Sequence, residues 1–248
     1  MKRLTITLAL SLLTLLVGCT SVMGATTTNP TALPNASSCN PLPNGTGPYT
    51  YVAIGASDAV GIGANCPATQ GYVPLLGQRM PANSHIVNEG ISGATVRVAT
   101  TYELQAAIAA KPNIITVWLA ANDFRAMENG TLTLATYTQQ LDQLLGQLHA
   151  STTAHVYVAN LPDLTKLPYF MHGLVPLSTV GVQTRAWNVA IAGVVAKNGD
   201  TLVNLYLSDI ASHPDYIWID GFHPSTKGYV VLTNTFWAVI QAHGDPKP

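Results

Sequence analysis

The stretch YVAIGASDAVG, residues 51–61, decides the fold, because an apolar run gives way there to small and polar residues. Residues 51–55 are apolar or small throughout, which is typical of a strand that is covered on both faces of a parallel sheet. Ser57 follows this run almost directly. Functional residues of such sheets lie at the carboxyl ends of the strands, so the serine stands where a site is expected. A turn is the simpler role for a loop serine taken alone.

The same alternation continues along the rest of the chain. Leucines at three- and four-residue spacing predict a helix over residues 136–150, and two more helices are predicted at 183–197 and 228–242. Apolar runs predict strands at residues 50–55, 85–88, 114–120, 155–160 and 202–205. Repeated strand–helix units predict an α/β fold, a single three-layer α/β/α domain with a mainly parallel, about five-stranded sheet.

Length and composition bound the class of protein. With 248 residues, 48% of them hydrophobic, the chain can bury one sizeable core. Only 9% of the residues are charged and the formal net charge is −1, which provides no basic surface for nucleic acid. We therefore predict one folded domain over residues 49–248 and no nucleic-acid partner.

The N-terminus has the pattern of an export signal. Two basic residues precede the apolar run 4–17, which is too short for a membrane span. The run closes with Leu-Val-Gly-Cys, which resembles the lipobox of bacterial lipoproteins, where the signal is cut before a cysteine that then carries lipid. This resemblance implies a signal peptide over residues 1–18 and a lipid anchor on Cys19 at the bacterial cell envelope. The alternative is an ordinary secretory signal cut near residue 24, which would leave a secreted protein.

Residues 19–48 are rich in Thr, Pro, Asn and Ser and have no hydrophobic periodicity, which predicts a flexible tether. Cys39 lies in this segment and Cys66 lies just after the serine loop. The oxidising compartment of an exported protein permits a disulfide between them, and two buried free thiols are the alternative.

A second candidate for chemistry is WIDGFHPS, residues 218–225. Asp220 and His223 are three residues apart, so on a turn the carboxylate can accept a hydrogen bond from one imidazole nitrogen while the other faces outward. A serine needs such a base, oriented by such an acid, to act as a nucleophile. A capping turn is the alternative for this pair taken alone.

Two other predicted strand ends carry groups that can bind a negatively charged oxygen. NEGISGAT, residues 88–95, offers the backbone N–H of Gly93, and WLAANDF, residues 118–124, offers the side-chain amide of Asn122. With the N–H of Ser57 these make three donors for the oxyanion of ester hydrolysis. Asp123 is expected to brace its loop. Each segment alone is explained equally well by a turn, so the prediction depends on their combination.

Together the four segments resemble the blocks of the SGNH hydrolases, also called the GDSL esterase and lipase superfamily, over roughly residues 49–244. IGAS resembles the first block, NEGISG the second, AAND the third and DGFHP the last. The resemblance implies a flavodoxin-like fold and an acyl-enzyme mechanism, with Ser57 as nucleophile and Asp220 and His223 as acid and base. Gly93 and Asn122 then join the Ser57 N–H in the oxyanion hole.

Two positions depart from the usual pattern of that family. Its Gly-Asp-Ser is Gly-Ala-Ser here, with Asp58 after the serine, and Ala120 replaces a glycine two residues before Asn122. Neither change removes a group that performs the chemistry. Both affect what the family pattern implies about the first and third segments and about substrate preference.

These features predict a monomeric carboxylic ester hydrolase without cofactor or metal, acting on an acyl or acetyl ester of a lipid or glycan. The alternative is a non-catalytic surface lipoprotein of the same fold that binds glycan or lipid. The α/β-hydrolase fold is rejected, because it places strands before the nucleophile and only a signal and a tether precede this strand. Residues 161–177, a long apolar segment, form either a lid or binding wall or a loop packed on the core.

Overall fold

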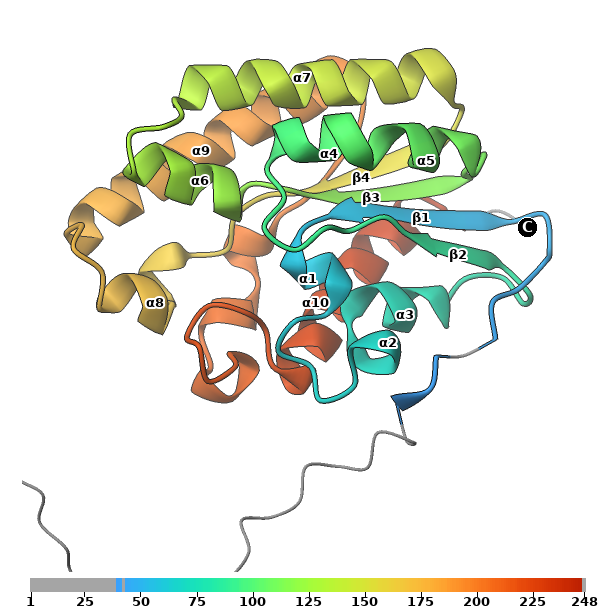
Figure 1. The fold of residues 1–248 in the computed structure, drawn as a ribbon, viewed down its shortest axis with the longest axis horizontal. Helices are drawn as coiled ribbons and strands as arrows, with labels where there is room; N and C mark the ends of the chain where they lie inside the picture. The colour runs from blue at the N-terminus through green and yellow to red at the C-terminus, as the bar shows by residue number, and fades with distance from the viewer. Residues whose placement is uncertain (1–38, 42, 247–248) are drawn as a thin grey trace, which may run out of the picture. The chain divides into compact units, whose positions relative to one another are not determined.

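The chain was analysed in a computed structural model that describes residues 39–41 and 43–246. Its centre is a parallel sheet of five strands in the order β2-β1-β3-β4-β5 (Figure 1). All four strand pairs are parallel. The strands are β1 (Thr50–Gly55), β2 (His85–Asn88), β3 (Ile114–Trp118), β4 (His155–Ala159) and β5 (Thr201–Val203). The predicted parallel sheet is confirmed.

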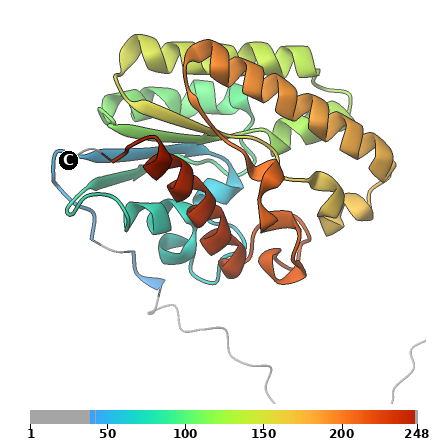
Figure 2. The same cartoon turned by 180° about the vertical axis from the view of Figure 1, so that it is seen from behind.

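Helices cover both faces of the sheet (Figures 1 and 2). One face carries α4 (Val96–Tyr102), α5 (Leu104–Ala109), α7 (Leu134–Ser151) and α9 (Leu177–Asn198). The other carries α2 (Pro67–Gln70), α3 (Tyr72–Gly77) and α10 (Thr226–Ala242). Val52 and Ile54 of β1 enter the first core and Tyr51 and Ala53 enter the second, since successive side chains of a strand point to opposite faces. This is the predicted three-layer α/β/α architecture.

The longest helix extends further than the sequence pattern predicts. α9 begins at Leu177, six residues before the predicted start, and ends at Asn198, where Gly199 adopts the left-handed conformation that terminates helices (φ 76°). Its first turns contain Ser, Thr and Gly, which have low helix propensity. Val180 and Gly181 are buried there against the domain, so tertiary packing outweighs local preference.

The strand order creates a topological switch point between the neighbouring strands β1 and β3. The chain passes from β1 to β2 on one side and returns to β3 on the other, so the connections diverge after β1 and β3. Such a switch point is where parallel α/β sheets bind ligands. α1 (Ser57–Val60) follows β1 and α6 (Ala121–Glu128) follows β3, both at this edge (Figure 1).

The loops at the same edge contain short helical turns. They are α8 (Pro168–Met171) and the 3-10 turns η2 (Leu164–Lys166), η3 (Leu205–Leu207), η4 (Asp209–Ala211) and η5 (Pro214–Tyr216). α8 belongs to the apolar segment 161–177, and the backbone N–H of Tyr169 donates to the carbonyl of Gly221 at 3.0 Å. The segment packs on the core through Leu164, Leu167 and Phe170 and is also fixed to the Asp220–His223 turn.

The described end of the predicted tether is bound to the domain. Cys39 and Cys66 form a disulfide. The side chain of Asn44 makes two hydrogen bonds to the backbone of Ile86, accepting from its N–H at 2.7 Å and donating to its carbonyl at 2.9 Å. The flexible character predicted for residues 19–48 therefore does not extend to this part.

The predicted signal peptide 1–18, the lipidation residue Cys19 and most of the predicted tether lie outside the described residues, so these assignments stay predictions. Within the part of the chain that the structure describes, no helix has both the length and the apolar character needed to cross a bilayer.

Candidate active site

The structure brings Ser57 next to Asp220 and His223. These two residues share one short turn and lie 163 or more residues after the serine in the sequence. Ser57 begins α1 at the end of β1, and its Oγ lies 2.8 Å from Nε2 of His223, which is 166 residues away in sequence. Nδ1 of the same ring lies 2.5 Å from Oδ2 of Asp220. Since the carboxylate accepts a hydrogen bond from the N–H at Nδ1, Nε2 carries no hydrogen and is left as the acceptor that faces the serine hydroxyl.

The Asp220 carboxylate is oriented by its own turn. Its Oδ1 accepts the backbone N–H groups of Phe222 at 2.9 Å and His223 at 3.0 Å, while Oδ2 faces the ring. Burial alone would raise the pKa of Asp220, but the hydrogen bonds from the His223 ring and from these two N–H groups outweigh it and lower the pKa. The group is therefore held as a charged acceptor.

Backbone contacts fix the loop that carries the histidine. The N–H of Trp218 donates to the carbonyl of His223 at 2.8 Å, and Ile217 and Pro224 form an antiparallel bridge. Gly221, with φ 74°, lies so close to Pro168 that a Cβ would meet its side chain at 2.9 Å. This position requires glycine for both its conformation and its packing.

Two backbone donors at this edge have no acceptor in the described part of the protein. Among the described residues, neither the N–H of Ser57 nor that of Gly93 makes a hydrogen bond to another protein group. Gly93 is exposed and has φ 81°, and a Cβ built on it would meet nothing within 4 Å. Glycine is thus favoured here by its backbone conformation, while the open space leaves room for a ligand.

Asn122, near the start of α6, is tied to the Gly93 loop. Its Nδ2 donates to the carbonyl of Ala94 at 3.0 Å, which uses one of the two amide hydrogens and leaves the other available. The neighbouring Asp123, which is fully buried, accepts the N–H of Val96 with both oxygens at 3.2 Å. Burial raises the pKa of Asp123 to about 7. The expected bracing role of Asp123 agrees with these bonds.

The arrangement links a serine hydroxyl, an imidazole and a carboxylate by hydrogen bonds, and comparisons with known proteins identify the family. A family model described as GDSL-like lipase/acylhydrolase matches residues 53–231. The chain belongs to the GDSL-like lipase/acylhydrolase family. Membership of this family makes the protein a carboxylic ester hydrolase, so the predicted family and enzyme class are confirmed.

Solved structures of similar fold accompany this match. The structure of TesA is 22% identical with a TM-score of 0.64, and the match covers 78% of this chain and 98% of TesA. The lipase/acylhydrolase from Enterococcus faecalis is 18% identical with a TM-score of 0.63, over 81% of this chain and 99% of that one. The psychrotrophic esterase EstA from Pseudoalteromonas sp. is 19% identical with a TM-score of 0.62, over 79% and 99%. No curated protein sequence matches the chain significantly.

The two departures from the GDSL pattern have structural explanations. Ala120 has φ −173°, an extended backbone that any residue adopts, so the glycine usual in the family is not required. Ala56 is 5% exposed and its carbonyl accepts the N–H groups of Ala59 and Val60 at the start of α1. Its small side chain suits this buried position.

Sequence analysis missed one acid that supports this GDSL site, Glu103. It is fully buried at the junction of α4 and α5, and its Oε2 accepts the N–H of Gly55, two residues before Ser57, at 2.8 Å. Burial raises the pKa of Glu103 to about 8. The only available signal was a lone acid within the apolar and Thr-rich segment TTYELQAAIAA.

A narrow apolar pocket adjoins the reactive groups. Its walls include Asp58, Ala121, Phe222 and Pro224, each of them the chain neighbour of Ser57, Asn122 or His223. The volume is about 20 Å³, close to that of one water molecule. Asp58 is 8% exposed, and burial raises its pKa to about 6, although nearby His223 lowers it.

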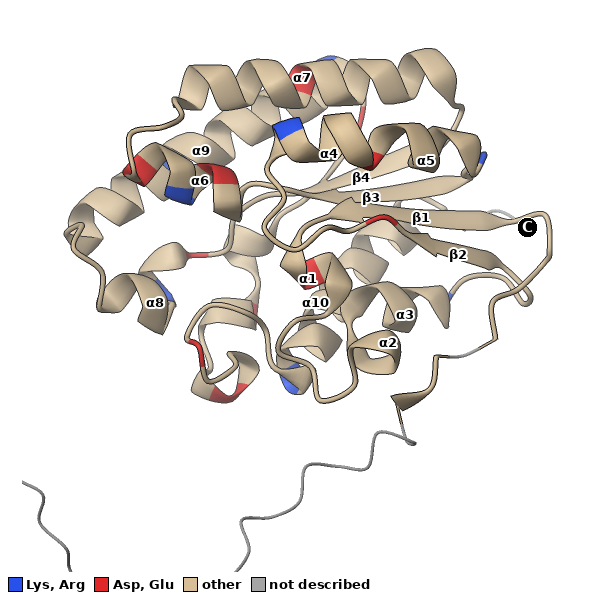
Figure 3. Cartoon of the chain, viewed as in Figure 1, with Lys and Arg blue, Asp and Glu red and all other residues tan. Residues whose placement is uncertain are grey.

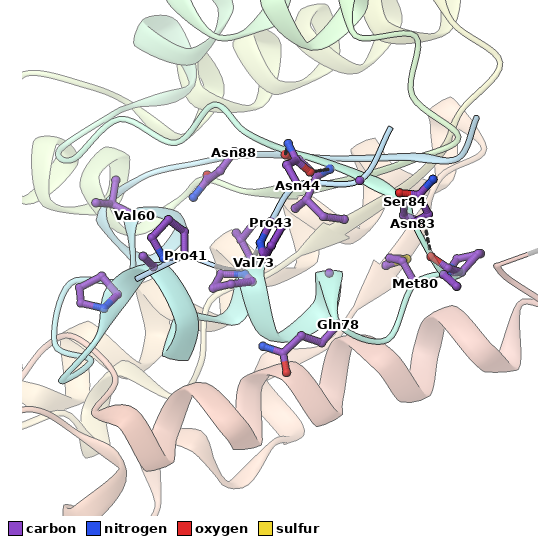
Figure 4. Close-up of a pocket in the computed structure, with 18 residues that line it drawn as sticks. Pro41, Pro43, Asn44, Val60, Val73, Gln78, Met80, Asn83, Ser84 and Asn88 are labelled. Carbon is purple, nitrogen blue, oxygen red and sulfur yellow. Dashed lines mark hydrogen bonds between the residues drawn. The ribbon is translucent and has the colours of Figure 1, made fainter. Parts of the chain in front are cut away.

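A larger cavity, of about 570 Å³, lies between residues 41 and 43–45 on one side and the elements α2, α3 and β2 on the other (Figure 4). Pro43, Val73 and Met80 line it, but Ser57 and His223 do not. This cavity therefore takes no part in the arrangement described above. Among the described residues, no group of three or more His, Cys, Asp or Glu side chains is arranged to hold a metal ion.

Proposed function

We propose that this GDSL-family protein hydrolyses its ester through an acyl-enzyme on Ser57, with His223 as general base and acid and Asp220 as the orienting carboxylate. The observation that carries the proposal is the pair of hydrogen bonds at His223, 2.8 Å to Ser57 Oγ and 2.5 Å to Asp220 Oδ2. These distances are within reach for proton transfer.

The reaction follows from these contacts. His223 Nε2 takes the Oγ proton of Ser57 as Oγ attacks the ester carbonyl, and the carbonyl oxygen becomes an oxyanion. The protonated ring then gives its proton to the leaving alcohol as the C–O bond breaks, which leaves an acyl-serine. Water repeats the two steps, with His223 again as base, and releases the carboxylic acid. Asp220 stabilises the imidazolium that forms each time.

We assign the oxyanion to the N–H groups of Ser57 and Gly93 and the amide of Asn122. The support is that both N–H groups lack a protein acceptor among the described residues, and that Asn122 keeps one amide hydrogen after bonding Ala94. Preorganised donors of this kind act on charge that develops only in the transition state.

The narrow pocket beside these groups supports a small acyl group, such as acetyl. A volume of about 20 Å³ has no room for a long chain unless its walls move. Hydrolysis of 4-nitrophenyl esters of increasing acyl length tests this assignment, and we expect the acetate to have the highest kcat/KM.

The test of the mechanism is the same assay on the Ser57→Ala variant. We expect wild type to hydrolyse 4-nitrophenyl acetate and the variant to be inactive with an unchanged melting temperature, because His223 is the only hydrogen-bond partner of the serine hydroxyl among the described residues. An active variant would refute Ser57 as the nucleophile, whereas an inactive wild type that still binds glycan or lipid would support the non-catalytic alternative.

We further propose that the protein is exported and held at the bacterial cell envelope by a lipid on Cys19. The support is the sequence pattern of residues 1–19 and the disulfide between Cys39 and Cys66, which is typical of an oxidising compartment.

A further inference from the structure

Arg125 is held between two aromatic rings in the described part of the domain. The carbon of its guanidinium group lies 5.0 Å from the centroid of the Tyr169 ring and 5.7 Å from that of Phe222. The two rings contact each other edge to face, with centroids 5.3 Å apart. A guanidinium that stacks on rings is fixed in orientation, while the N–H groups around its edge remain able to donate.

Two neighbouring residues, Phe222 and Asn122, place Arg125 close to the reactive groups. Phe222 precedes His223, and their rings are 5.1 Å apart at an interplanar angle of 88°. On α6, Arg125 comes three residues after Asn122, which places both side chains on one side of the helix, about 4.5 Å apart along its axis. Arg125 therefore lies at the rim of the site, several bond lengths from the position proposed for the ester carbonyl.

The N–H donors of Arg125 are not used by any group in the described part of the protein. Among residues 39–41 and 43–246, the guanidinium makes no hydrogen bond to a protein acceptor and no ion pair. Lys166 in η2 pairs with Asp163 at 3.6 Å, and Lys227 in the first turn of α10 pairs with Asp215 at 3.0 Å.

Glu128 is the carboxyl on the same helix that Arg125 influences. Burial raises the pKa of Glu128 and the positive charge of Arg125 lowers it, without an ion pair between the two. Charged residues are sparse over the whole ribbon (Figure 3). Arg125 is therefore a cation without an ion pair among the described residues that two aromatic rings hold beside the site.

We propose that Arg125 binds a negatively charged group of the substrate, so that the enzyme prefers esters that carry a carboxylate a few bonds from the scissile carbonyl. The inference rests on the proposed function, since it names the substrate class of the same site. A planar guanidinium accepts a carboxylate through two parallel hydrogen bonds. The aromatic rings keep water from one side of the cation, which strengthens its attraction for an anion. The small acyl pocket favours the alcohol part as the one that carries the charge.

The test compares matched pairs of esters that differ by one charge. 4-Acetoxy-3-nitrobenzoate and its methyl ester place the charge on the leaving group. The 4-nitrophenyl half-ester of succinate and its methyl ester place it on the acyl side. For each pair we measure the ratio of kcat/KM for the anionic ester to that for the neutral ester, at low and high salt, and subtract the rate with Ser57→Ala.

We expect wild type to prefer the anionic member of the leaving-group pair, with the preference reduced by salt. Arg125→Gln should lower the ratio roughly 5- to 30-fold, the effect of one charged hydrogen-bonding contact at a partly exposed site. Arg125→Lys keeps the charge without the planar fork and should retain an intermediate ratio. The control is Arg79→Gln, which removes an equal charge that bonds Asn234 at 2.5 Å, and its ratio should equal that of wild type.

Three results overturn the inference: a wild-type ratio near one for both pairs, a ratio that Arg125→Gln leaves unchanged, or an equal loss of ratio in the Arg79→Gln control. If only the succinate pair shows the preference, Arg125 still binds the carboxylate, but on the acyl side of the ester and not on the leaving group. Failure of wild type to hydrolyse any of the four esters counts against the proposed function, which is a separate outcome, because the inference is read from ratios of measurable rates.

Discussion

Removal of the Asn122 side chain tests the part of the mechanism for which the sequence offers the least specific motif. Asn122→Ala deletes two contacts at once, the free amide hydrogen that we assign to the oxyanion and the bond to the carbonyl of Ala94. The two losses act on different quantities. The first acts on the transition state, and the second on the stability of the folded protein.

The structure separates the expected magnitudes. Loss of one oxyanion donor costs about 10²- to 10³-fold in kcat, or roughly 3–4 kcal/mol, while the N–H groups of Ser57 and Gly93 remain. Since the donor acts on charge that is full only in the transition state, kcat should fall much more than KM rises. The lost bond to Ala94 should lower the free energy of unfolding by about 1 kcal/mol, which corresponds to a melting temperature lower by about 2–4 °C.

The assay is steady-state hydrolysis of 4-nitrophenyl acetate together with thermal unfolding of the same samples. Asn198→Ala is the matched control, because its Nδ2 bonds Asp142 at 2.9 Å and Val194 at 3.0 Å near the end of α9. We expect the control to lose comparable stability and to keep its kcat. Asn122→Asp should be at least as inactive as Asn122→Ala, since a carboxylate repels the oxyanion. Near-normal kcat in a folded Asn122→Ala variant would refute the assignment and leave Asn122 as a bracing residue only.

Three further predictions concern stability and location. Because burial raises the pKa of Glu103 to about 8, above its ordinary value, its contribution to stability is complete at low pH and is lost as the pH rises through 8. Glu103→Gln keeps an acceptor for Gly55 without ionising, so the stability of wild type relative to this variant should fall by about 2–4 kcal/mol between pH 5 and 9 in denaturant titrations, and parallel curves would contradict the reasoning. Reduction of the Cys39–Cys66 bond, which closes a loop of 27 residues in sequence separation, should lower the free energy of unfolding by roughly 3–4 kcal/mol, and an unchanged melting temperature would argue against it. Cys19→Ser should move the protein from the membrane to the soluble fraction or block signal processing, whereas normal processing with retention on membranes would exclude the lipid anchor.

The sequence by itself determined the features that depend on neighbours along the chain. Runs of apolar residues predicted the strands, and leucine spacing predicted most of α7, because such patterns are local properties that each segment carries with it. The turn from Asp220 to His223 is local in the same way, since both side chains and the N–H groups that orient the carboxylate lie within four residues. For this reason the acid and base could be named before the fold was known.

Only the tertiary structure decided which distant groups meet. The strand order sets β1 beside β3, and this brings Asn122 to the carbonyl of Ala94, 28 residues earlier, and Glu103 to the N–H of Gly55, 48 residues earlier. No local pattern distinguishes Glu103 from a surface acid, because its burial depends on how α4 and α5 pack over the sheet. Arg125 likewise reads as an ordinary helix residue, and its position between two rings depends on α8 and the histidine turn meeting α6. Such pairings depend on the path of the chain between elements, which side-chain periodicity does not encode.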